Sequence, residues 1–71
     1  MALRWTDSRP IGEALYERFP ETHPLEVRFT DLHRWVCELP EFDDSPDASS
    51  EQHLEAIQMI WYEEWQLDNE D

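Results

Sequence analysis

The sequence predicts a small, mainly α-helical domain of three helices with minimal β structure. The chain has 71 residues, which is enough for one domain only. Three segments repeat apolar residues with the spacing of a helix, and prolines or turn residues separate them. Four Trp, three Phe and two Tyr supply large apolar surfaces to a core that would otherwise be marginal.

The first helix is expected over residues 8–19. An apolar residue recurs there every four positions, which places one stripe along a single helix face. Asp7 is among the N-cap candidates, Pro10 suits a first turn, and Pro20 ends the pattern. The stripe consists of Ile11, Leu15 and Phe19.

The second helix carries the clearest periodicity in the chain. A brief helical turn at Pro24 precedes it, Thr30 is its expected N-cap, and Pro40 ends it. Its apolar residues follow the i, i+3, i+4, i+7 pattern of an amphipathic helix. They are Leu32, Trp35, Val36 and Leu39.

A loop over residues 40–50 leads to the third helix. Phe42 is expected to tuck inward and hold this loop, and Ser49 with Gln52 forms a capping box. The buried face of the third helix should comprise Leu54, Ile57, Ile60, Trp61 and Trp65. We expect β structure only at residues 3–5 and in part of the loop.

The predicted domain organisation is simple. Residues 1–66 form a single domain, and residues 67–71 form a disordered acidic tail because they lack an apolar anchor. The first two helices, joined at Pro24, suggest a relative of the helix-turn-helix, and the loop over residues 40–50 lies where a wing would be.

Charge is distributed very unevenly. Eighteen acidic residues face five arginines, and the formal net charge is −13. The five arginines lie in the first 34 residues beside six acids, whereas residues 35–71 contain twelve acids and no Lys or Arg. Solubility needs a net charge of only a few units. We therefore expect the acidic C-terminal half to face a basic partner.

Several functional classes are disfavoured by the sequence. A DNA-reading helix needs Lys or Arg near phosphates, and the third helix offers only acids. The chain lacks Gly-x-Ser-x-Gly, a phosphate loop and His-Glu-x-x-His, and it is too small for a deep cleft. No apolar run approaches 18 residues, and Cys37 is the only cysteine. We expect a cytoplasmic, monomeric, non-catalytic protein with no nucleic-acid or membrane partner.

Carboxylates on the second helix, the loop and the third helix are candidate metal ligands. If the loop folds back, they gather on one face, where hard cations, including ferrous and ferric iron, accept such oxygens. A solvated acidic face explains the same composition equally well. His33 and Cys37, four residues apart, could form half of a metal site, but a packed cysteine beside a surface histidine is the favoured interpretation.

Several separated short motifs agree in order and spacing with those of a known family. They are Trp5–Ser8, Ile11–Tyr16, Val27–Asp31, Phe42–Asp44, Leu54–Ile57 and Trp61. Together they closely resemble the IscX family of bacterial iron–sulfur cluster assembly proteins, without gaps over about residues 3–64.

The resemblance implies a winged-helix-like fold and an adaptor function. The adaptor would bind a basic surface of a cysteine desulfurase, compete there with bacterial frataxin, and bind Fe2+ or Fe3+ weakly and exchangeably. The implied iron ligands are Asp31, Glu38, Glu41, Asp43 and Asp44. The expected partner-binding residues are Glu13, Glu17, Asp31, Arg34, Glu38, Asp43, Asp44, Asp47, Glu51 and Glu55.

Two features depart from the family pattern. Ser45 stands where a third consecutive acid is usual, which would weaken a metal site in the loop. Residues 67–71 lie beyond the pattern, so no function is transferred to them.

The alternative function is a general acidic interaction module that mimics nucleic acid and does not bind iron specifically. Met59 and Tyr62 are expected to point outward. They either pack under the loop or form an apolar patch for a second partner.

Overall fold

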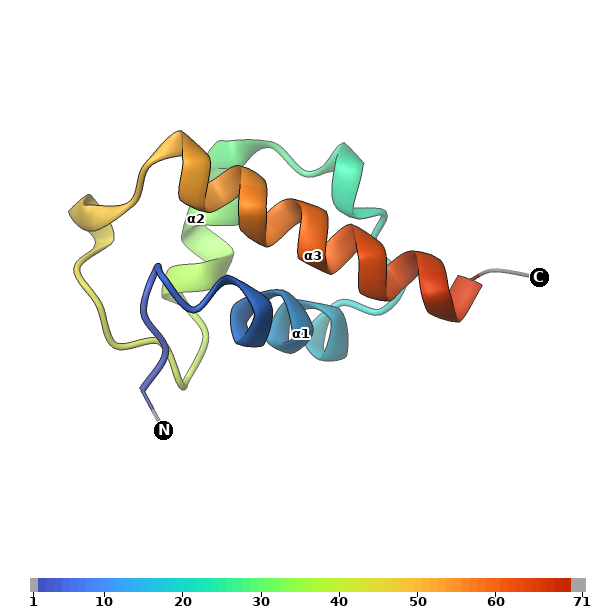
Figure 1. The fold of residues 1–71 in the computed structure, drawn as a ribbon, viewed down its shortest axis with the longest axis horizontal. Helices are drawn as coiled ribbons and strands as arrows, with labels where there is room; N and C mark the ends of the chain where they lie inside the picture. The colour runs from blue at the N-terminus through green and yellow to red at the C-terminus, as the bar shows by residue number, and fades with distance from the viewer. Residues whose placement is uncertain (1, 70–71) are drawn as a thin grey trace.

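The computed structural model describes residues 2–69, which form three α-helices, two short 3-10 helices and one isolated β-bridge (Figure 1). The described part of the chain contains no named strand, so the mainly α, three-helix prediction is confirmed. In chain order the elements are α1 (Ser8–Arg18), η1 (Pro24–Glu26), α2 (Phe29–Cys37), η2 (Pro46–Ala48) and α3 (Glu51–Asn69).

Helices α1 and α3 pack closely against each other because Gly12 lies at their contact. A Cβ at this position would lie 2.6 Å from Ile60 Cγ2 and 3.1 Å from the backbone nitrogen of Trp61. The absence of a side chain therefore lets the two helices approach. The core fills the space between these helices and α2. Its buried apolar residues are Leu3, Trp5, Ile11, Leu15, Leu32, Val36, Leu39, Leu54, Ile57 and Trp61.

The N-terminal segment lies beside the loop that follows α2 (Figure 1). Leu3 and Phe42 form a parallel bridge, in which Leu3 N–H donates to Glu41 O at 2.7 Å and Asp43 N–H donates to Leu3 O at 2.8 Å. The ring of Phe42 meets that of Trp5 edge-on, with centroids 4.8 Å apart. The predicted inward position of Phe42 and the small β content are confirmed.

Two predicted helix caps are wrong. Thr30 lies inside α2, whose N-cap is Arg28 with no side-chain capping bond. At α3, the hydroxyl that accepts a helix N–H belongs to Ser50, which receives His53 N–H at 3.3 Å, in place of Ser49. Phe29 lies against the core, and α2 begins there, two residues before the start that a Thr30 cap predicts. Tertiary packing thus outweighs local capping preference.

Helix α3 extends beyond the predicted domain boundary at residue 66 and ends at Asn69. The Tyr16 hydroxyl donates to a carboxylate oxygen of Asp68, so this part of α3 contacts α1. The predicted disorder of the tail stays a prediction, and its last two residues lie outside the described residues. None of the helices described here is long and apolar enough to cross a membrane.

Candidate functional site: an acidic surface around the loop after α2

The predicted partner residues lie on the outside of the molecule. We define the acidic surface as the predicted side chains of α2, the following loop and the start of α3. Asp31 and Asp44 are half-buried, and the other members are exposed. The acidic surface consists of Asp31, Arg34, Glu38, Glu41, Asp43, Asp44, Asp47, Glu51 and Glu55.

The loop that carries the middle of this surface is held in place at several points. Besides the bridge to Leu3, the Trp5 indole N–H donates to Ser45 O at 2.7 Å. His33 Nε2 lies 2.6 Å from Pro46 O, and the His33 ring stacks on Trp5 with centroids 5.3 Å apart. The loop over residues 40–50, called the acidic loop below, is therefore attached to both the N-terminal segment and α2.

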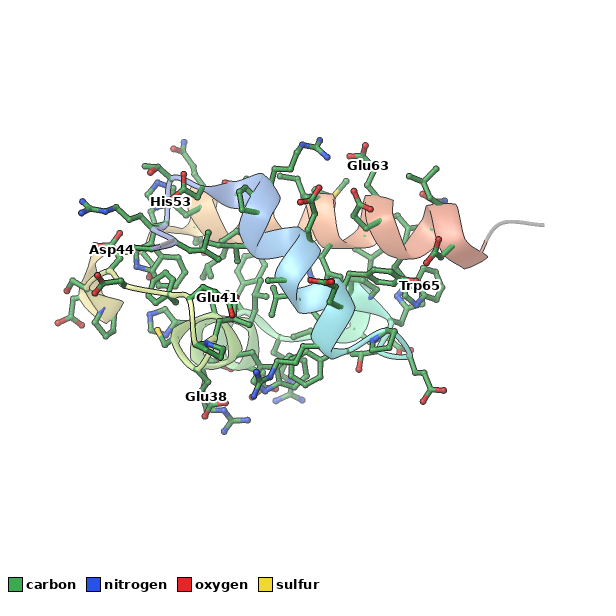
Figure 2. The ribbon with its side chains drawn as sticks, turned by 90° about the horizontal axis from the view of Figure 1, so that it is seen from below. Glu38, Glu41, Asp44, His53, Glu63 and Trp65 are labelled. Carbon is green, nitrogen blue, oxygen red and sulfur yellow. The ribbon has the colours of Figure 1, made fainter. Side chains whose placement is uncertain are left out.

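Asp44 is the acid most involved in this attachment. One carboxylate oxygen accepts Trp5 N–H at 3.1 Å, and the other accepts Ser45 N–H at 2.7 Å. These two backbone donors lower the pKa of Asp44, and the nearby charges of Arg4 and His53 add to the effect. Figure 2 shows Asp44 and His53 on the same side of the molecule. The Asp44 carboxylate thus has a structural role within the fold.

Asp31 and Arg34 form an ion pair on the surface of α2. The Arg34 Nη2 to Asp31 Oδ1 distance is 3.7 Å, and the two side chains are 63% and 45% exposed. Exposed pairs of this kind contribute at most about 1 kcal/mol. The pair can therefore open at little cost when another charge approaches.

Glu13 and Glu17 lie on the outer face of α1, and both are exposed. The fold brings Glu17 near Glu41, since both line one groove between α1 and the turn after α2. The sequence placed these two acids in separate elements and gave no indication that they share a groove. Glu13 does not line this groove.

The proposed iron ligands do not form a preformed metal centre. No group of three His, Cys, Asp or Glu side chains within residues 2–69 is arranged to hold a metal ion. Glu38, Glu41 and Asp44 lie well apart in Figure 2, with Glu38 pointing away from the molecule. Asp44 is further occupied by its two backbone donors. Within residues 2–69, the fold therefore does not bring the predicted ligands together into one donor set.

His33 and Cys37 are neighbours on α2, with Nδ1 and Sγ 4.0 Å apart. Burial raises the pKa of the Cys37 thiol, and the negative charge of Glu38 raises it further. Cys37 is therefore a neutral thiol at pH 7. Since His33 Nε2 faces Pro46 O, this histidine joins α2 to the loop.

Trp5 is the important residue to which the sequence analysis gave no role. It is 1% exposed, and its backbone and indole nitrogens both donate to the acidic loop. The only sign of its importance in the sequence was its place in the Trp5–Ser8 motif. A single tryptophan before a helix does not reveal a partner 40 positions away.

Comparison with known proteins places this structure in a family. The sequence profile of the iron–sulphur cluster assembly family matches residues 3–66. The chain is also similar to the uncharacterized protein PA3808 of Pseudomonas aeruginosa, with 55% identity over 64 residues, which cover 90% of this chain and 97% of that protein. The expected resemblance is confirmed, and the chain belongs to the IscX family of iron–sulphur cluster assembly proteins.

Proposed function

We propose that this protein is a non-catalytic adaptor that binds a cysteine desulfurase through the acidic surface. Its family concerns iron–sulphur cluster assembly, and the desulfurase is the partner that the family resemblance implies. One observation carries the proposal: residues 35–71 contain twelve acids and no Lys or Arg. The attached loop holds part of this charge outward, which suits a basic partner surface.

Electrostatics would govern how such a complex forms. Complementary charges increase the association rate and select the partner, and salt within the physiological range screens exposed charges over about 8–10 Å. Competition with bacterial frataxin follows if both proteins occupy the same basic surface. The proposal includes a cytoplasmic monomer and a winged-helix-like arrangement in which the loop after α2 takes the position of the wing.

Iron would bind weakly to exposed carboxylates in this proposal. Glu38, Glu41 and Asp43 are exposed, and hard cations accept carboxylate oxygens. Asp31 would first have to leave Arg34. Asp44 is the least available of the five predicted ligands because its oxygens already accept backbone N–H groups. Binding of this kind is exchangeable and poorly selective.

The test is the affinity for the cysteine desulfurase of the same organism, measured by calorimetry over a series of salt concentrations. A triple variant, Glu38→Gln with Asp43→Asn and Asp47→Asn, should weaken binding by about two orders of magnitude at low salt, because three partner-facing charges are lost. The control is Glu63→Gln with Glu21→Gln and Glu26→Gln, which removes three exposed charges outside the acidic surface. This control should change the affinity much less.

Three results would contradict the proposal. They are undetectable binding of the wild-type chain, an affinity that does not change with salt, and equal losses in the two triple variants. Capture of a DNA-binding protein in place of the desulfurase, with no response to iron, would support the general acidic module. Iron is tested separately by NMR line broadening, which should be confined to residues 31–55.

A further inference from the structure

A groove lies between the C-terminal half of α1 and the turn that follows α2. It has a volume of about 330 Å³. Figure 2 shows Glu41 beside α1, in front of the end of α2. The lining residues are Ala14, Glu17, Arg18, Leu39, Pro40 and Glu41.

The groove has a mainly polar lining with a small apolar part, and it contains two available carboxylates. Ala14 and Leu39 pack in or against the core, and Leu39 is 4% exposed. Glu17 and Glu41 are exposed, and neither side chain forms an ion pair or hydrogen bond within residues 2–69. Both carboxylates are therefore free to accept hydrogen bonds from outside the chain.

Arg18 offsets one of the two negative charges in the groove lining. It is exposed and forms no ion pair with either neighbouring acid within the described residues. With two acids and one arginine, the lining carries a formal charge of −1. This balance fits one cationic side chain better than a polybasic segment.

We propose that this groove receives one Lys or Arg side chain from the surface of the protein's basic partner. The aliphatic stem would lie against Ala14 and Pro40, while the charged end would reach Glu17 and Glu41. Long basic side chains bury their stems on apolar surface in this way and keep their charge near polar groups. Charge-assisted hydrogen bonds to carboxylates are about twice as strong as neutral ones.

This inference rests on the proposed function for the identity of the partner, and it adds a specific contact outside the acid-rich α3. It predicts that recognition depends on α1 as well as on the loop. General attraction to the acidic C-terminal half would not distinguish Glu17 from any other exposed acid. The experiment therefore compares acids of equal charge at different places.

The first measurement uses the desulfurase. Glu17→Gln and Glu41→Gln should each weaken binding about fivefold or more, since a docked cation loses a direct partner. Glu63→Gln is the matched control, because Glu63 is exposed on α3 and lies away from the groove in Figure 2. It should change the affinity less than twofold. Equal effects at the three positions would overturn the groove proposal and leave the desulfurase proposal intact.

The second measurement needs no desulfurase. N-acetyl-arginine amide is titrated into the isolated chain and followed by NMR, with N-acetyl-citrulline amide as the neutral control of the same shape. The arginine probe should shift the amide signals of residues 14–18, Leu39 and Glu41, and Glu17→Gln should abolish these shifts. If the desulfurase does not bind the wild-type chain, groove-confined shifts still support the groove. Shifts spread over all acidic residues, or equal shifts with both probes, would overturn it.

Discussion

The side-chain carboxylate of Asp44 accepts a hydrogen bond from the backbone N–H of Trp5, at 3.1 Å and across 39 positions of the chain. Its other oxygen accepts Ser45 N–H at 2.7 Å, and the Trp5 indole donates to Ser45 O at 2.7 Å. One acid of the predicted iron and partner set thus holds the N-terminal segment to the loop. Its neighbours Asp43 and Asp47 are exposed and remain available to a partner.

Replacement of Asp44 should loosen the N-terminal segment. In Asp44→Ala the Trp5 amide loses its acceptor, so its hydrogen exchange should become about tenfold faster or more. Asp43→Ala removes the same charge from the adjacent exposed residue and keeps its backbone bond to Leu3. This control should leave exchange at Trp5 nearly unchanged. Equal exchange rates in the two variants would show that the Asp44 bond does not restrain the segment.

The same carboxylate predicts a loss of stability in acid. The pKa of Asp44 is lower in the folded protein, chiefly because Trp5 N–H and then Ser45 N–H favour the charged form. Its contribution is therefore complete above the unfolded pKa of about 3.9 and is lost as the pH falls through the folded value. Urea unfolding from pH 6 to pH 2 should show a steeper loss of stability for the wild type than for Asp44→Asn. Parallel curves below pH 4 would contradict this assignment.

Gly12→Ala should destabilise the packing of α1 on α3. Alanine is favoured over glycine inside a helix by about 1 kcal/mol, but the new Cβ would meet Ile60 Cγ2 at 2.6 Å and Ile60 Cβ at 3.0 Å. Overpacking costs about 1–3 kcal/mol. The two effects leave a net loss of up to about 2 kcal/mol in the free energy of unfolding, which urea unfolding measures.

The matched test of that clash is a double-mutant cycle with Ile60→Ala. Removal of the Cγ2 atom opens space for the new methyl group, so Gly12→Ala should be less destabilising in the Ile60→Ala background than in the wild type. The close Trp61 nitrogen, at 3.1 Å, limits this rescue. Strict additivity of the two changes would mean that the Ile60 side chain is not the cause.

The contact between Tyr16 and Asp68 predicts an unusual tyrosine titration. The hydrogen bond to Asp68 is the largest cause of a raised pKa for Tyr16. Any stability from this contact is therefore present below the unfolded pKa of about 10 and is lost as the pH rises through the folded value. In a Tyr62→Phe background, absorbance should report Tyr16 alone, and Asp68→Asn should lower its pKa. An unchanged titration would show that the contact does not persist in solution.

The helices were predictable because their physical causes are local. The pairs Ile11/Leu15 in α1 and Leu32/Val36 in α2 have helical spacing and are fully buried. Pro20 and Pro40 follow the ends of α1 and α2. The caps were less predictable. Thr30 and Ser49 have suitable side chains, but α2 begins at Phe29, which packs against the core, and α3 begins at Glu51. Tertiary contacts readily exceed the contribution of about 1 kcal/mol from one cap.

The amino-acid sequence alone was enough to predict the three helices, the acidic character of the C-terminal half and, through short motifs, the family. Periodicity, charge and motif order are properties of the chain alone. The contact of Asp44 with Trp5, and the groove that Glu17 shares with Glu41, became visible only in the folded chain. These pairs are far apart in sequence, and they meet because the core brings α1, the loop and the N-terminal segment together. That packing gives Asp44 hydrogen bonds within the fold and leaves Glu17 and Glu41 available to a partner.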